Sequence, residues 1–260
     1  MKYEFNNEEH LHLLDGKPLT GTSSVSKVLG NPALTWWASA RAVETLGWLD
    51  PKKNSPESVK TALREGYNRV KGLSFHEYEK ALAEAYKAHS KRLKEAADKG
   101  TDLHAELEKY VKWHMRKTAV ITYDEKILPF VDWATKNVKR FIASEAHCYD
   151  EELWVGGITD AVAELNDGKL AIIDFKSAKD AYTSHFIQAS GYCIQVEKNG
   201  LFSEDGEHSI KLDRPIEALI VVPFGAEKVE PHFRYDIENY KKGFKNCVEL
   251  YRLLGFDKIN

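Results

Sequence analysis

The sequence predicts an α/β protein in which a helix-rich N-terminal region is followed by a sheet with flanking helices. Residues 74–99 are rich in Ala, Glu, Lys and Leu, and their apolar or aromatic side chains recur every three or four positions, which is helical spacing. Three successive segments with strand character then follow at residues 146–155, 158–165 and 170–177. We therefore expect an α/β sandwich in which the early helices form one wall or a lid.

The first part of the chain is expected to hold a small hairpin before the helices begin. Tyr3 and Phe5 alternate with other residues, and Asp15-Gly16 is a turn signal, so a β-hairpin is expected within the first twenty residues. Further expectations here are a short helix at residues 23–29, a second helix at 34–46 and a loop at 50–58.

Gly100 is expected to end the long helix that precedes it, because glycine is common just past a helix C-terminus. Thr101 or Asp102 would then cap a further helix that runs to Trp113. Beyond it we expect a helix at residues 126–144, a hairpin turn at 166–168, a helix at 184–197, a strand at 216–223 and a closing helix at 237–254.

The overall composition limits the class of protein without deciding its function. With 37 Lys and Arg residues against 40 Asp and Glu residues, the chain lacks the basic field of histone-like or arginine-rich proteins, although a local basic groove stays possible. The 260 residues suit a single domain, with residues 1–99 as hairpin and helical wall and residues 100–260 as the core. The polar start of the chain and the short longest apolar run (218–224) predict a cytoplasmic protein with no membrane partner.

The three cysteines are expected to be buried or free thiols in a reducing compartment. They are too few for the four ligands of an ordinary iron–sulfur cluster, and no pair of them has zinc-site spacing. We therefore expect no iron–sulfur cluster.

The segment around residues 158–176 is predicted to form a hairpin that gathers charged side chains at one end. Asp174 and Lys176 are two residues apart on one strand, so their side chains share a face. If residues 166–168 form a three-residue loop, residues whose numbers sum to 334 stand opposite each other, and Asp160 faces Asp174. A two-residue loop would shift this pairing by one position.

Two carboxylates held close together repel each other unless they are protonated or bridged by a cation. Oxygen ligands suit Mg²⁺ or Mn²⁺, and a neighbouring lysine can stabilise a developing anion or help to activate water. These groups suit metal-assisted hydrolysis of a phosphodiester. The alternative is an exposed Asp–Lys cross-strand pair worth under about 1 kcal/mol, which is the better interpretation of an isolated motif of this kind.

The motif is not isolated, because its pieces match a known nuclease pattern in the expected order. Gly157-Ile158-Thr159-Asp160 and Asp174-Phe175-Lys176-Ser177 together resemble the signature of the PD-(D/E)xK nuclease superfamily, in its RecB-like and phage-exonuclease branch. The sequence departs from the pattern at Thr159, where the family has proline, and at Asp174, where many relatives carry glutamate. Further matching pieces are Gly100 to His104 with Glu108, Glu145, the Gln188 and Tyr192 pair, and more loosely residues 23–26 and 36–38.

The resemblance implies a restriction-endonuclease-like αβα core with a central mixed sheet, and it implies roles for individual residues. The implied ligands of one or two Mg²⁺ or Mn²⁺ ions are His104, Asp160, Asp174 and the backbone carbonyl of Phe175, with Glu145 and Glu108 as further candidates. The implied catalytic residues are Asp160, Asp174, Lys176 and Gln188, and the implied DNA contacts are Ser177, Lys179 and Tyr192. A structural histidine, a solvated Glu108 and a Tyr192 that packs on the sheet are the alternatives.

The implied activity is that of a metal-dependent DNA exonuclease that hydrolyses phosphodiester bonds at single- or double-stranded DNA ends in phage-type recombination, replication or repair. A recombination or single-strand-binding protein is a further expected partner. Two alternatives stay open: an endonuclease of the same fold, and a non-catalytic DNA-binding or scaffold protein whose hairpin charges form only a salt bridge.

Overall fold

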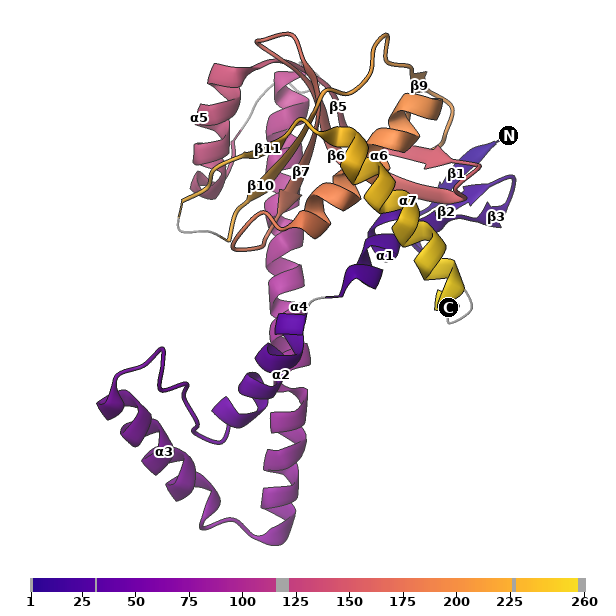
Figure 1. Ribbon diagram of the computed structural model, residues 1–260. Coiled ribbons are helices and arrows are strands. Elements are labelled where there is room, and N and C mark those ends of the chain that lie inside the picture. Colours follow the sequence, from indigo (N-terminus) through magenta and orange to yellow (C-terminus); the bar gives the residue numbers. More distant parts are fainter. Residues whose placement is uncertain (1, 31, 116–121, 226–227, 257–260) are drawn as a thin grey trace. The chain divides into compact units, whose positions relative to one another are not determined.

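A computed structural model describes residues 2–30, 32–115, 122–225 and 228–256 (Figure 1). The chain divides into two compact units: a core unit of residues 1–29 and 100–260, and a helical unit of residues 30–99. We expected one domain whose two regions meet near residue 100. A boundary does fall there, but the N-terminal hairpin belongs to the core unit, because Tyr3, Leu14 and Leu19 pack with Tyr149 in a buried cluster.

The helical unit is built from α2 (Pro32–Glu44), α3 (Pro56–Val70) and the first part of α4 (Phe75–His114). The helix expected at residues 34–46 is confirmed as α2. The loop expected at residues 50–58 is shorter than predicted, because Pro56 occupies the first turn of α3, where its missing N–H costs nothing. Ser55 caps this helix by accepting a hydrogen bond from the backbone N–H of Ser58 at 3.2 Å.

Helix α4 runs without interruption for 40 residues, so the predicted break at Gly100 is wrong. A glycine inside a helix costs about 1 kcal/mol relative to alanine. Downstream of it, Leu107, Tyr110 and Val111 are fully buried in the main core cluster. Burial of three such side chains is worth several kcal/mol, which outweighs the local preference of Gly100 for a helix end.

The centre of the core unit is a mixed sheet of eight strands in the order β11-β10-β7-β6-β5-β8-β9, with β4 pairing in parallel to β6. Strands β5, β6 and β7 are antiparallel neighbours, whereas β7 and β10 are parallel. Their bounds are β4 (Thr20–Gly21), β5 (Val138–Asp150), β6 (Val155–Leu165), β7 (Leu170–Lys176), β8 (Leu201–Phe202), β9 (Ser209–Ile210), β10 (Ala218–Pro223) and β11 (His232–Arg234).

Strand β5 begins earlier than predicted. The helix expected over residues 126–144 is a 3₁₀ turn, η2 (Glu125–Ile127), followed by α5 (Leu128–Asn137), and the chain then enters the sheet at Val138. From Val138 to Asp150 it pairs with β6 along its whole length, with two register shifts. Pairing with the following strand, β6, therefore overrides the helical spacing of residues 138–144, an effect that the local pattern does not contain.

Helices cover both faces of the sheet (Figure 1). Alternate residues of β7 face opposite layers, as expected for a strand: Ala171, Ile173 and Phe175 pack with α5 and the end of α4. Leu170 and Ile172 pack with α6 (Thr183–Asn199) on the other face. Helix α7 (Ile237–Leu253) packs against α6, where the Phe244 ring lies over Gly191. The core unit is thus a three-layer arrangement of helices, mixed sheet and helices.

The N-terminal segment adds a three-stranded sheet of β1 (Tyr3–Asn6), β2 (Leu11–Leu14) and β3 (Lys17–Pro18), followed by α1 (Thr22–Ser26) and the 3₁₀ turn η1 (Lys27–Leu29). The predicted hairpin and short helix are both confirmed. The three cysteines are buried free thiols, as expected. Among the helices that the structure describes, none is long and apolar enough to cross a membrane.

Candidate functional site

The β6–β7 hairpin has the register that the sequence predicted. Ala161 stands opposite Ile173 and Val162 opposite Ile172, and each pair of numbers sums to 334. Asp160 and Asp174 are the next positions beyond the last of these pairs, at the end of the ladder where the two strands stop pairing. The hairpin therefore brings two carboxyl groups together at the edge of a buried sheet.

The side chain of Asp160, on β6, accepts a hydrogen bond from the backbone of the neighbouring strand β7. Its Oδ2 accepts a hydrogen bond from the backbone N–H of Phe175 at 2.6 Å. Because the N–H and C=O of one strand residue point to the same side, the carbonyl of Phe175 is directed toward β6 as well. The other carboxylate oxygen, Oδ1, lies 3.6 Å from Nδ1 of His104.

Asp174 is almost fully buried, and only one of its two carboxylate oxygens has a hydrogen-bond partner among the described residues. Its Oδ1 accepts a hydrogen bond from Nζ of Lys176 at 2.8 Å, while its buried Oδ2 has no hydrogen-bond partner among the described residues. Burial raises the pKa of the Asp174 carboxyl, Lys176 opposes this rise and the charge of Asp160 adds to it. A buried carboxylate oxygen without a partner is costly, so a cation or a proton donor at this position is favoured.

Lys176 carries its positive charge at neutral pH. Burial favours the neutral amine, but the charges of Asp174 and Asp160 outweigh burial and raise the pKa of Lys176 above its usual value. Its hydrogen bond to Asp174 acts in the same direction. Lys176 is therefore a cation beside the two carboxylates and cannot accept a proton in this state.

Glu145 lies on β5 and is also close to Asp160. The pairs Ser144–Ala161 and Ala146–Thr159 flank it, which places Glu145 opposite Asp160 in the register. Its φ of 45° is a left-handed conformation that costs an ordinary residue about 1–2 kcal/mol. Burial, followed by the charge of Asp160, raises the pKa of its carboxyl. Strain and an unfavourable charge at one residue are typical of a functional position.

The ligand atoms of His104, Glu145 and Asp160 all lie within 4.8 Å of one another. Three elements, α4, β5 and β6, thus meet at one point. Burial lowers the pKa of His104, but its hydrogen bond to Asp160 and the charges of Asp160 and Glu145 raise it overall. The His104 ring lies edge-on to Phe175, with centroids 6.2 Å apart.

These residues fit a divalent cation. Carboxylates and a neutral imidazole are ligands that Mg²⁺ and Mn²⁺ accept. Burial, and to a smaller extent the charge of Asp160, raises the pKa values of Glu145 and Asp174, and a bound cation would offset both effects. The unpartnered Oδ2 of Asp174 is a further available donor atom. Residues that would hold the ion are His104, Glu145, Asp160 and Asp174.

Helix α6 supplies a further side of the site through Gln188 and Tyr192. Nε2 of Gln188 donates a hydrogen bond to the Tyr192 hydroxyl at 2.8 Å. Burial and the charges of Asp174 and Asp160 raise the pKa of Tyr192, so its hydroxyl lies close to the carboxylate pair and stays protonated. The ring also lies against Gly157, where an added Cβ would stand 2.6 Å from Cε1 of Tyr192. Tyr192 therefore both packs on β6 and orients Gln188.

His185 lies on the same side of the site, on α6, and was not among the residues predicted from the sequence. Burial and the positive charge of Lys176 lower the pKa of His185 to about 4, so it is neutral at the site. Its Nδ1 accepts a hydrogen bond from the backbone N–H of Tyr182 at 3.3 Å. The signal was present in the spacing, because His185, Gln188 and Tyr192 follow one another at three and four residues on one helical face.

The remaining candidates lie around this centre. Glu108 forms an ion pair with Lys112 on α4 and lies outside the triad of ligand atoms, although its charge adds to the raised pKa of Glu145. Ser177 and Lys179 are exposed beyond the end of β7. Ser177 lies beside α4, since an added Cβ at Gly100 would stand 3.4 Å from its Oγ.

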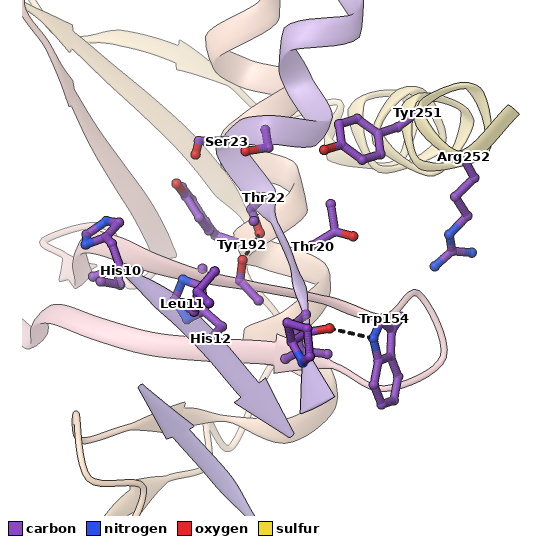
Figure 2. Close-up of a pocket in the computed structure, with 17 residues that line it drawn as sticks. His10, Leu11, His12, Thr20, Thr22, Ser23, Trp154, Tyr192, Tyr251 and Arg252 are labelled. Atoms are coloured by element: carbon purple, nitrogen blue, oxygen red, sulfur yellow. Dashed lines mark hydrogen bonds between the residues drawn. The ribbon is translucent and has the colours of Figure 1, made fainter. Parts of the chain in front are cut away.

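A pocket of about 720 Å³ opens beside Tyr192 (Figure 2). Its walls include residues 20–24 and, from β6, Gly157 and Ile158. Helix α7 contributes Tyr251 and Arg252. Trp154 lines it too, and its Nε1 donates a hydrogen bond to the Pro18 carbonyl at 2.9 Å. The early serine-rich stretch noted in the sequence is thus brought next to the Asp160 strand.

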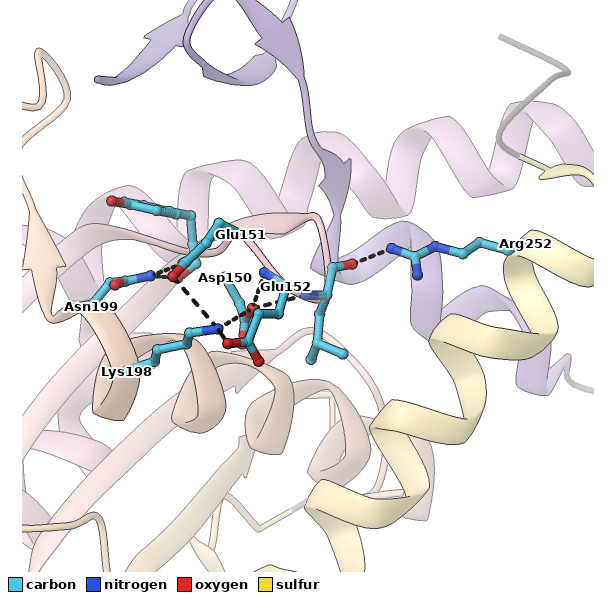
Figure 3. A network of polar contacts seen from close by, with 8 residues as sticks. Asp150, Glu151, Glu152, Lys198, Asn199 and Arg252 are labelled. Carbon is cyan, nitrogen blue, oxygen red and sulfur yellow. Dashed lines mark hydrogen bonds and ion pairs between the residues drawn. The ribbon is translucent and has the colours of Figure 1, made fainter. Parts of the chain in front are cut away.

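The loop that carries Trp154 is fastened by a polar network (Figure 3). Nζ of Lys198 lies 3.1 Å from Oδ1 of Asp150, and Nδ2 of Asn199 donates to Glu151 at 2.6 Å. Arg252 donates to the carbonyl of Leu153. These contacts hold the β5–β6 turn against α6 and α7 and account for the acidic run there without a ligand.

Searches against models of protein families and against curated proteins return no match for this chain.

Proposed function

We propose that the protein is a divalent-metal-dependent DNA nuclease with a restriction-endonuclease-like core of the PD-(D/E)xK type. The observation that most supports this proposal is that His104, Glu145 and Asp160 converge beside the buried Asp174–Lys176 pair. An exposed salt bridge, the competing interpretation, does not account for an Asp174 that is 1% exposed and has an unpartnered oxygen.

The chain's own residues divide the work of phosphodiester hydrolysis. Mg²⁺ or Mn²⁺, when bound by His104, Glu145, Asp160 and Asp174, supplies positive charge beside the phosphate and lowers the pKa of water. Lys176, which is charged at neutral pH, stabilises the negative charge that grows on the phosphate oxygens. The amide of Gln188, oriented through its hydrogen bond to Tyr192, positions the phosphate or the attacking water.

The metal site requires the carboxylates to lose their protons. Raised pKa values for Asp174 and Glu145 mean that protons and cations compete for the same oxygens. Cleavage is therefore expected to rise with pH across the neutral range, as the carboxyl groups become available to the cation.

Exonuclease action at DNA ends is the form of the activity that the resemblance to end-processing nucleases supports, with the exposed Ser177 and Lys179 as contacts to the DNA backbone. An endonuclease of the same fold would use the same centre. A covalently closed circular DNA separates the two, because an exonuclease leaves it intact and an endonuclease linearises it.

The test is degradation of end-labelled linear DNA, single- and double-stranded, in the presence of Mg²⁺ or Mn²⁺. Asp174→Asn is expected to lower the initial rate about 100-fold or more. The matched control is Asp167→Asn, which changes an exposed aspartate in the turn of the same hairpin and should leave the rate unchanged. A wild-type rate no higher than that of Asp174→Asn would overturn the proposal. Mn²⁺ titration by calorimetry completes the test, because a non-catalytic scaffold would take up no ion at this site.

A further inference from the structure

The helical unit carries an exposed apolar stripe on α4. Phe75 is 85% exposed and Tyr86 is 77% exposed, and Tyr78, Leu82 and Leu93 are exposed as well. His89 lies between Tyr86 and Leu93. Together the six residues follow one another at three or four positions and so form one continuous row along the helix. A row of this length and size on a water-facing surface is typical of an interaction site.

The stripe is distinct from the side of α4 that packs within its own unit. That side is marked by Ala85, which is 4% exposed, and by Arg92, which lies 3.8 Å from Glu44 of α2. At about 100° per residue, both positions lie to one side of the row formed by Leu82 and Tyr86. The contact with α2 therefore leaves the stripe uncovered.

The charges on α4 favour a protein partner over a nucleic acid. Lysines that could hold phosphates lie on the far side of the helix from the stripe: Lys80, Lys87, Lys91 and Lys94. A single-stranded nucleic acid needs cations beside the aromatic side chains on which its bases stack. Among the cationic side chains that the structure describes on this part of α4, Arg92 lies nearest the stripe, and it is paired with Glu44 of α2. The stripe therefore fits the apolar face of another helix better than a row of stacked bases.

The spacing of the stripe makes it complementary to itself. The numbers of Phe75 and Leu93 sum to 168, as do those of Leu82 and Tyr86, and those of Tyr78 and His89 sum to 167. Two copies of α4 placed antiparallel about a point beside residue 84 would therefore set each large side chain against a row member of the other copy. Such a contact is isologous and closes with two-fold symmetry.

The available area is sufficient for such a pair. The five exposed fractions, applied to about 200 Å² for each large side chain, give roughly 600 Å² per copy. Complete burial of these residues in two copies would remove at most about 1,200 Å² from water, which is the lower end of the range for stable protein interfaces.

We propose that the protein forms a two-fold symmetric dimer in which the stripes of two α4 helices pack antiparallel. The proposal is independent of the nuclease activity, because it depends only on residues of the helical unit. It is also specific about direction and register: Leu82 of one copy faces Tyr86 of the other.

Sedimentation equilibrium of the full chain, over about 1 to 50 μM, tests the dimer. The wild type is expected to approach twice the mass of one chain. Leu82→Glu places two like charges near the two-fold axis and should weaken the dimer about 100-fold or more. The matched control is Ala83→Glu, one position along and outside the stripe, which should associate as the wild type does. Circular dichroism checks that helix content is unchanged in both variants.

A wild-type protein that stays monomeric over this range would overturn the proposal, as would a Leu82→Glu variant that associates like Ala83→Glu. Direction is tested by mixing Leu82→Cys protein with Tyr86→Cys protein under mild oxidation; the native cysteines are buried. Antiparallel packing predicts that the crosslink between the two variants exceeds the crosslink that either variant forms alone. A dominant 82–82 crosslink would instead refute the antiparallel register.

Discussion

Glu145 should reduce the stability of the metal-free protein while it contributes to metal binding. Its carboxyl is buried near Asp160, and both burial and that charge raise its pKa above the usual value of 4.5. In the unfolded chain this carboxyl ionises near pH 4.5. As pH rises above 4.5 toward the raised folded-state pKa, the folded state keeps a proton that the unfolded state has lost, so stability falls.

Glu145→Gln should remove this pH-dependent loss of folding stability, because glutamine does not ionise, and it leaves the backbone conformation unchanged. Each unit by which the pKa is raised costs the folded wild type about 1.4 kcal/mol once the pH exceeds the folded-state pKa. In EDTA the variant should therefore be as stable as the wild type at pH 4, and more stable by at least about 1.4 kcal/mol at pH 8. Urea unfolding at both pH values measures the difference. Glu145→Gly should add up to about 1 kcal/mol, because it also relieves the strain of the left-handed φ of 45°.

Mn²⁺ should stabilise the wild type more than it stabilises Glu145→Gln. At 100 times the dissociation constant, a bound ion stabilises the wild type by about 2.7 kcal/mol. A tenfold weaker site in Glu145→Gln leaves about 1.4 kcal/mol at the same Mn²⁺ concentration. If the variant is less stable than the wild type in EDTA at pH 8, and Mn²⁺ stabilises both proteins equally, then Glu145 is an ordinary structural residue and the reasoning fails.

Further predictions concern the lysine, the packing of the α6 wall and the N-terminal cluster. Lys176→Met should lower the rate of DNA cleavage about 100- to 1,000-fold, because it removes the charge that stabilises the transition state, while calorimetry should still detect Mn²⁺ binding. Gly157→Ala should cost about 1–3 kcal/mol in urea unfolding, since its Cβ would stand 2.6 Å from the Tyr192 ring, whereas Gly72→Ala, with no atom within 4 Å, should change stability little. Burial lowers the pKa of His147 to about 4, so its contribution to stability is present above pH 6.5 and is lost as pH falls toward 4. His147→Gln should remove about 1.4 kcal/mol per pH unit of that slope, and an unchanged slope would show that the histidine is not buried as described.

The β6–β7 hairpin shows what local sequence can predict about the site. A turn signal at residues 166–168 and the two-residue period of a strand were enough to place Asp160 opposite Asp174 and to put Lys176 on the face of Asp174. The same two-residue period places Ala171, Ile173 and Phe175 together on the opposite face of β7. These features depend on residues that are neighbours along the chain, so their geometry follows from the backbone.

The other half of the site depends on contacts that the local patterns did not predict. Glu145 meets Asp160 only because β5 pairs with β6 through residues that had a helical pattern, and its left-handed φ is imposed within that ladder. Nδ1 of His104 lies 3.6 Å from Oδ1 of Asp160 where the C-terminal part of α4 packs on the sheet through Leu107 and Val111. The charge states of Asp174 and Lys176 likewise depend on burial, which no local pattern reports.

By itself, then, the sequence determined the order of the main elements from β6 to α7, the register of one hairpin and the identity of the carboxylates and the lysine at its end. Only the tertiary structure decided that Glu145 joins them, that His185 lies beside Lys176 and that one oxygen of Asp174 is buried without a partner. The physical reason is that hydrogen-bonding period and turn chemistry act over a few residues. Burial, long-range strand pairing and the electrostatic field are set by the whole folded chain.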